Sequence, residues 1–71
     1  MDSNELLYDV LAVDMGTHKV AVIGSNKTAR NAEAIENMAV MRRGVDAEFF
    51  VTVPAGKYSN GDEWDTDDEG I

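Results

Sequence analysis

The densest run of strand-forming residues in this 71-residue chain lies near its N-terminus and is Leu6-Leu7-Tyr8-Asp9-Val10-Leu11-Ala12-Val13. Side chains alternate between the two faces of an extended chain, and here apolar residues occupy both faces. That distribution is typical of a strand covered on both sides. We therefore expect this segment to be the central strand of a small sheet.

A second strand is predicted immediately after a short connection, and its sequence is Lys19-Val20-Ala21-Val22-Ile23. A tight turn with Gly16 in the left-handed conformation would pair Val10 with Val20 and Tyr8 with Val22. The stretch Gly24-Ser25-Asn26-Lys27 is expected to end this strand. In that register one face of the hairpin would hold Tyr8, Val10, Ala12, Val20 and Val22 and form the floor for a helix.

A helix is predicted over residues 28–43, where good helix formers dominate. Thr28 or Ser25 can accept hydrogen bonds from the free amides of its first turn. The residues expected on its inward stripe, at three- and four-residue spacing, are Ala32, Ile35, Met38, Ala39 and either Met41 or Arg42.

A third strand is predicted at residues 48–53, with Phe49, Val51 and Val53 on one face. Because the helix returns the chain, this strand can lie antiparallel beside the first strand. The predicted fold is therefore a small α+β domain of β-β-α-β order, in which a three-stranded antiparallel sheet has strand order 2-1-3 and one helix on one face.

One helix covers only one face of such a sheet, so a second apolar face needs a cover. The residues expected on it are Leu7, Leu11, Val13, Ile23 and Phe50. A contiguous apolar patch of this kind is typical of an interface, and self-association into a dimer is one interpretation. The alternative is that residues 54–64 fold back over the sheet, with Tyr58 and Trp64 as the covering side chains.

The C-terminal ten residues differ sharply from the rest of the chain in charge. Residues 62–71 contribute -6 and residues 1–61, with eight acids and six bases, contribute -2 to the net charge of -8. Such a block of like charges stays hydrated and attracts basic partners. We expect a single domain over residues 1–61 and an acidic, disordered tail over residues 62–71. Its carboxylates belong to Asp62, Glu63, Asp65, Asp67, Asp68 and Glu69.

The chemistry of the chain argues against catalysis. It contains no cysteine and a single histidine, His18, so neither a thiolate zinc site nor a catalytic constellation is evident. The turn Asp14-Met15-Gly16-Thr17 is similar to the phosphate turn of sugar kinases and actin-like ATPases, but those folds need two large lobes. Residues 65–70 match half of a calcium loop, whose twelfth position falls beyond Ile71. We expect no enzymatic activity, no cofactor and no metal site.

Location and direct nucleic-acid binding follow from the same composition. The N-terminus is acidic where a signal peptide is basic, and no apolar run approaches the ~20 residues that span a bilayer. We therefore expect a cytoplasmic protein without membrane contact. Direct binding to nucleic acid would need a basic footprint, which this chain lacks.

The charge density of the tail is within a factor of two of that of a DNA strand, which carries one phosphate per ~3.4 Å of helix axis. Small size, acidity, β-β-α-β order and the tail Asp62-Glu63-Trp64-Asp65-Thr66-Asp67-Asp68-Glu69 together resemble bacteriophage host-takeover proteins. The closest resemblance is to DNA mimics of Bacillus phages that inhibit the histone-like nucleoid protein HU.

This resemblance implies that the chain binds the DNA-contacting surface of HU in the host bacterial cytoplasm and displaces DNA. The tail carboxylates would supply long-range attraction, Trp64 would be the desolvated anchor, and Asp9, Asp46 and Glu48 would form a rigid part of the mimic. Two alternatives remain open: a phage inhibitor of host RNA polymerase, or a small structural, dimeric protein with a solubility tail.

Overall fold

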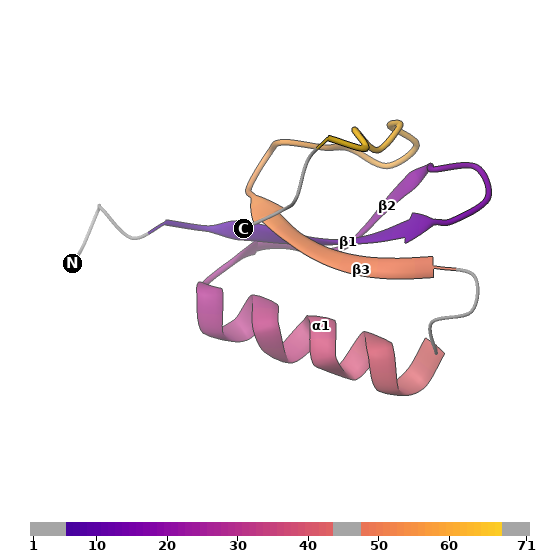
Figure 1. The fold of residues 1–71 in the computed structure, drawn as a ribbon. Coiled ribbons are helices and arrows are strands. Elements are labelled where there is room, and N and C mark those ends of the chain that lie inside the picture. Colours follow the sequence, from indigo (N-terminus) through magenta and orange to yellow (C-terminus); the bar gives the residue numbers. More distant parts are fainter. Residues whose placement is uncertain (1–5, 44–47, 68–71) are drawn as a thin grey trace.

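A computed structural model describes residues 6–43 and 48–67 of the chain. Its elements are β1 (Tyr8–Asp14), β2 (Val20–Lys27), α1 (Ala29–Arg43) and β3 (Glu48–Pro54) (Figure 1). The strands form one antiparallel sheet in the order β2-β1-β3, with the most apolar strand in the middle. The predicted α+β class, element order and strand order are confirmed.

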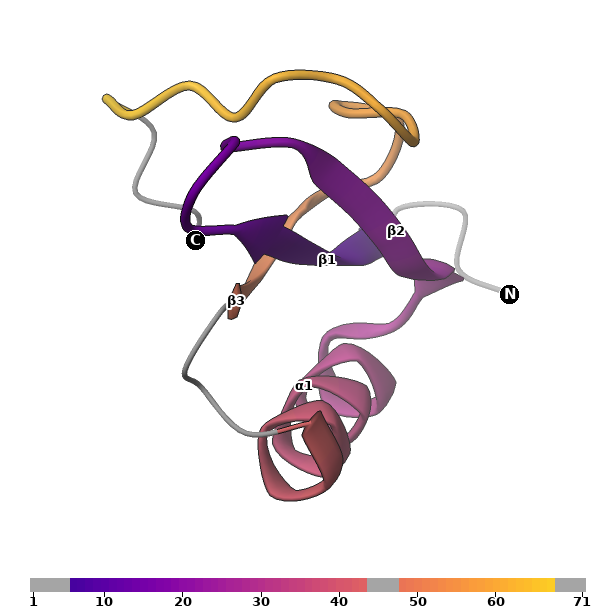
Figure 2. The ribbon, with the colours of Figure 1, turned by 90° about the vertical axis from the view of Figure 1, so that its right-hand side faces the viewer.

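Helix α1 begins as its sequence predicts and covers one face of the sheet (Figures 1 and 2). The Thr28 hydroxyl accepts a hydrogen bond from the Asn31 amide at 3.3 Å, so Thr28 is the N-cap. The helix approaches β2 closely at Gly24, where a Cβ atom would lie 2.9 Å from Cδ1 of Ile35. In the part of the chain that the structure describes, no helix has the length and apolar content needed to cross a membrane.

The helix-side core consists of small and medium side chains, the buried residues Val10, Ala12, Ala32 and Ala39. Beside them, the Thr52 hydroxyl donates a hydrogen bond of 2.7 Å to the Glu36 carboxylate, which ties β3 to α1. The predicted inward position is wrong for Met38, which is 49% exposed, and also for Met41, which is 83% exposed, and for Arg42, which is exposed. Each residue advances the helix by about 100°, so the residue before the buried Ala39 is carried around to the solvent side.

The hairpin register differs from the predicted one by three residues. Val20 pairs with Val13 rather than Val10, and Val22 pairs with Leu11 rather than Tyr8. A shift by an odd number of residues moves every side chain of a strand to the other face. Val20 and Val22 therefore lie on the face opposite α1, and the prediction that they lie on the face that the helix covers is wrong.

The turn between β1 and β2 explains the shift. It spans residues 15–19, and the left-handed residue is His18, with φ 63°, rather than Gly16. Histidine is among the non-glycine residues that adopt this conformation more readily. An Asp14 carboxylate oxygen accepts the Gly16 and Thr17 amides at 2.7 and 2.9 Å, which fixes the start of this longer turn.

Strand β2 also continues beyond the point where the sequence predicts its end, and it runs to Lys27. Register irregularities on both sides of Val10 accommodate the extra residues. Asn26 has a left-handed φ of 55°, and its amide donates to Asp9 at 2.9 Å. The predicted strand break at residues 24–27 is therefore wrong, because a bulged strand absorbs the polar residues.

Strand β3 contributes its alternating apolar residues to the face away from α1. Phe49, Val51 and Val53 pair with Val13, Leu11 and Asp9, whereas Phe50 and Thr52 pair with Ala12 and Val10 on the helix side. Phe50 therefore belongs to the helix face, and its predicted position on the second face is wrong.

The second face is covered by the chain itself. Residues 55–67, which we call the strap, cross the sheet on the side opposite α1 (Figures 1 and 2). Leu11 and Val13 are fully buried in a cluster with Val20, Val53 and Trp64. The interpretation of Leu11 and Val13 as a self-association surface is thus wrong, and the alternative of coverage by Tyr58 and Trp64 is confirmed. Of the other residues assigned to that surface, Leu7 is exposed and Ile23 is half-buried.

Candidate acidic interface

The strap turns back toward the sheet at residues 59–62. The Asp62 amide donates to the Ser59 carbonyl at 3.0 Å, and Gly61 has a positive φ of 89° that suits the third position of a type II turn. The Asp62 carboxylate accepts the Ser59 amide at 2.8 Å across the same turn. Residues 59–62 therefore form a turn with Asn60 and Gly61 at its centre, and this turn orients the chain that follows it.

After this turn the strap pairs with the outer edge of β2. Gly61 donates to the Val20 carbonyl and Val20 donates to the Asp62 carbonyl, both at 2.8 Å, and Trp64 donates to the His18 carbonyl at 2.7 Å. Glu63 lies opposite Lys19 as an antiparallel bridge. Residues 62–64, which the sequence assigns to a free tail, are thus part of the folded domain.

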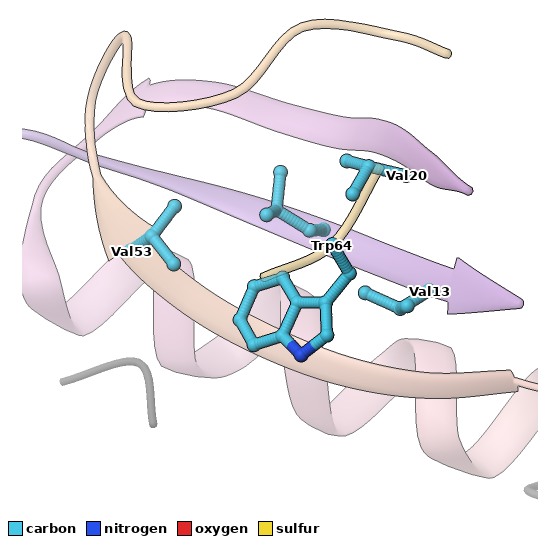
Figure 3. Close-up of a cluster of buried hydrophobic side chains, with 5 residues drawn as sticks. Val13, Val20, Val53 and Trp64 are labelled. Carbon is cyan, nitrogen blue, oxygen red and sulfur yellow. The ribbon is translucent and has the colours of Figure 1, made fainter. Parts of the chain in front are cut away.

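Trp64 holds the strap on the sheet. Only 7% of its surface is exposed, and Figure 3 shows its indole among Val13, Val20 and Val53. Its ring stacks on Tyr58, with centroids 5.2 Å apart, and meets the Phe49 ring edge to face at 5.7 Å. Aromatic pairs of this geometry add to the stabilisation that burial alone provides.

Burial of Trp64 orients its acidic neighbours toward solvent. Side chains alternate along an extended segment, so an inward residue 64 places residues 63 and 65 outward. We call residues 62–67 the acidic segment. Its exposed carboxylates belong to Asp62, Glu63, Asp65 and Asp67.

Two local hydrogen bonds shape the end of the acidic segment. The Asp65 amide donates to the Tyr58 hydroxyl at 3.3 Å, and the Asp67 amide donates to the Asp65 carboxylate at 3.0 Å. The chain after Trp64 is therefore guided by the strap's own aromatic residue and by a short Asx turn.

Asp14 lies at the same end of the molecule as Glu63. It bonds Lys19 through its backbone amide at 3.0 Å, and Lys19 in turn lies opposite Glu63. Amide hydrogen bonds from Thr17 and then Gly16 hold the pKa of the Asp14 carboxyl below its usual value of 3.8, because they stabilise the charged form. Since β2 lies between β1 and the strap, two strand spacings of about 4.8 Å each separate Asp14 from the strap.

The structure divides the predicted partner-binding residues into three groups. Asp62, Glu63, Asp65 and Asp67 are exposed on one continuous segment, and Glu48 pairs with Asp14 at the same end of the sheet. Asp9 and Trp64 are buried. Asp46, Asp68 and Glu69 lie outside the described residues.

Asp9 and Trp64 have structural roles that differ from the predicted ones. Asp9 is 4% exposed, and its two oxygens accept the Asn26 amide at 2.9 Å and the Gly56 amide at 3.0 Å. It therefore joins β2 to the start of the strap and is not available to a partner. Trp64 is desolvated as predicted, but by this chain's own sheet, so in this conformation it is not a contact residue.

The contribution of Asp14 was not foreseen from the sequence. The signal was present, because an aspartate with a glycine two residues later is typical of an Asx turn. The Asn60 side-chain oxygen accepts the Val22 amide at 2.6 Å, a second contact between the strap and β2 that local sequence does not predict.

Within residues 6–43 and 48–67 the surface has no pocket, and no three His, Cys, Asp or Glu side chains gather as a metal site would require. What these residues do present is a charged surface on an ordered backbone. A scan against protein-family models, a search of curated proteins and a search of solved structures each found no match to the chain.

Proposed function

We propose that this chain is a DNA-mimicking inhibitor whose acidic segment binds the DNA-contacting surface of a host nucleoid protein, with HU favoured, and displaces DNA. The observation that supports this proposal is the attachment of the acidic segment to the fold. Trp64 is buried while Glu63 and Asp65 on either side of it are exposed. The protein acts by binding and performs no chemistry of its own.

Attachment matters because a mimic must present charge in a defined place. A free tail would lose conformational entropy when it binds, which lowers affinity. Backbone hydrogen bonds from Val20 and Trp64 hold residues 62–64 against β2 before any partner arrives. The carboxylates of this part of the segment are therefore preorganised, and the cost of ordering them is met during folding.

Electrostatics favours a basic partner over other classes. The last ten residues carry -6 of the net charge of -8, so the field around this end of the molecule attracts cationic surfaces. A DNA-binding protein would exchange one anionic partner for another at the same site. Complementary charge speeds association and makes the affinity fall steeply with salt.

A competition assay tests the proposal: purified HU on labelled DNA is titrated with the chain at low salt, and released DNA is measured. The segment variant carries Glu63→Gln, Asp65→Asn and Asp67→Asn. The matched control carries Asp2→Asn, Glu5→Gln and Glu33→Gln, so that both change the net charge from -8 to -5. Asp62 is kept because its carboxylate caps the turn at Ser59.

We expect the wild-type chain to release DNA, the control to act like the wild type, and the segment variant to need about tenfold more protein. If the wild-type chain leaves HU on DNA, the assignment to HU is wrong. Repeating the titration with RNA polymerase on promoter DNA then tests the alternative partner. If the two variants lose activity equally, net charge and not the placed segment determines binding.

A further inference from the structure

The solvent-facing side of α1 carries apolar residues that folding does not use. Met41 is 83% exposed and Met38 is 49% exposed, and Ala34 lies one turn before Met38 on the same side. Arg30 and Arg42 flank them and are also exposed. We call these five residues, Arg30, Ala34, Met38, Met41 and Arg42, the outer helix stripe.

The inward side of α1 is already satisfied by other residues. Ala32 and Ala39 are buried against the sheet, Ile35 packs at Gly24, and Glu36 bonds Thr52. The two methionines of the outer helix stripe therefore contribute little to this chain's own core. Methionine and arginine are enriched at protein interfaces, and methionine adapts its shape to a partner.

The charge of the stripe indicates the chemistry of its partner. Among the described residues, no carboxylate pairs with Arg30 or Arg42. Cationic side chains at the two ends of the outer helix stripe suit an extended segment of carboxylates, because each arginine can donate charge-assisted hydrogen bonds to a carboxylate. The chain itself contains such a segment at residues 62–67, on the opposite side of the sheet (Figures 1 and 2).

We propose that the outer helix stripe binds the acidic segment of a second copy of this chain. The two surfaces match in length, since residues 30–42 of a helix span about 18 Å and six extended residues span at most about 20 Å. They lie on opposite sides of the sheet, so they cannot meet within one copy. The contact is therefore heterologous, and successive copies add head to tail instead of closing as a two-fold dimer.

This association does not depend on the proposed function, although it would cover the acidic segment and so compete with any basic partner. Its salt dependence is distinctive. At about 0.01 M salt the Debye length of about 30 Å lets two chains of net charge -8 repel each other. At about 0.1 M that repulsion is screened while pairs in contact persist, and at about 1 M the contact pairs also weaken.

Sedimentation of the full chain at submillimolar concentration tests the proposal at these three salt concentrations. We expect species beyond the monomer to be most abundant at the intermediate concentration. The helix variant Arg42→Glu should raise the dissociation constant about tenfold. The matched control Lys27→Glu changes the net charge equally, from -8 to -10, away from the stripe and should have a smaller effect.

A mixing experiment distinguishes this interface from every symmetric one. The Arg42→Glu chain retains an intact acidic segment, and the variant with Glu63→Gln, Asp65→Asn and Asp67→Asn retains an intact stripe. Each alone should associate about tenfold more weakly than the wild type, whereas their mixture should form a one-to-one dimer of wild-type affinity that grows no further.

Three results would overturn the proposal. A wild-type chain that stays monomeric at all three salt concentrations leaves the stripe to another molecule. Association that only increases with salt indicates apolar self-association without the acidic segment. A mixture no larger than its components excludes the heterologous contact. A failure to displace DNA from HU would contradict the proposed function but would not change the interpretation of these three sedimentation results.

Discussion

On one face of the sheet α1 supplies several small side chains along its length, whereas on the other face the strap, which lacks regular secondary structure, supplies one large side chain. Ala32 and Ala39 close the helix face, and Trp64 closes the strap face. A cover built from many small contacts tolerates the loss of one. A cover that depends on a single indole does not, and its loss also releases the acidic segment.

The largest expected effect is therefore that of Trp64→Ala. Replacing a buried tryptophan costs about 3–5 kcal/mol, and a chain of this length has a total stability of roughly 4–11 kcal/mol. We expect urea denaturation followed by circular dichroism to show this loss, which is about half of the total stability in the middle of that range and leaves the chain unfolded at its lower end.

Tyr58→Phe is the matched control, because it keeps the ring that stacks on Trp64 and removes the hydroxyl that accepts the Asp65 amide. It should cost no more than about 1 kcal/mol. A Trp64→Ala chain as stable as this control would show that the strap contributes little to the fold.

The helix face should yield a smaller effect. Ile35→Ala removes a side chain that is only half-buried, so we expect a loss of about 1–2 kcal/mol. Met38→Ala, on the exposed side of the same helix, should change the stability by no more than about 0.5 kcal/mol. If Ile35→Ala destabilises the protein as much as Trp64→Ala does, the proposed contrast between the two faces is wrong.

The sequence predicts the face that α1 covers better than the face that the strap covers. Residue periodicity and the Thr28 cap are local signals, and they were sufficient for α1 and for the strand order. The register of β2 was not predictable in this way, because it depends on whether Gly16 or His18 adopts the left-handed conformation. Hydrogen bonds to the Asp14 carboxylate decide that choice, and a three-residue error then exchanged the faces of Val20 and Val22.

Composition identifies the acidic residues of the segment but does not predict that the segment is attached to the sheet. Carboxylates on both sides of Trp64 indicate a solvated tail when only neighbouring residues are considered. The indole nevertheless lies on the sheet, because Leu11, Val13 and Val53 offer an apolar surface that is distant in sequence. Long-range burial outweighed local composition, and the same reasoning applies to Asp9, whose two amide donors come from residues 26 and 56.

Asp9→Asn tests the connection between β2 and the start of the strap. The carboxylate accepts the Asn26 and Gly56 amides with separate oxygens. An asparagine side chain has one acceptor oxygen, so its amino group would face one of these donors. Leaving one of these part-buried hydrogen bonds unmade costs about 1 kcal/mol.

Hydrogen exchange reads this loss directly, because exchange of the Gly56 or Asn26 amide should accelerate more than that of amides in the middle of β1. Glu33→Gln is the control for a generic loss of charge, because Glu33 is an exposed residue of α1. Unchanged protection at both Gly56 and Asn26 would contradict the role assigned to Asp9.

The smallest expected effect is the pH dependence at the turn between β1 and β2. Hydrogen bonds from the Thr17 and Gly16 amides lower the pKa of Asp14 in the folded protein below 3.8. The folded state therefore binds this proton less readily than the unfolded chain does, so the stabilisation is fully present above about pH 4 and is lost as the pH falls through the folded-state pKa. NMR titration of the Asp14 carboxyl should give a midpoint below 3.8, and the Asp14→Asn chain should lose stability less steeply on acidification than the wild type. A midpoint at or above the ordinary value would mean that the two amides do not hold the carboxylate in solution, and the turn that sets the register of β2 would then need another cause.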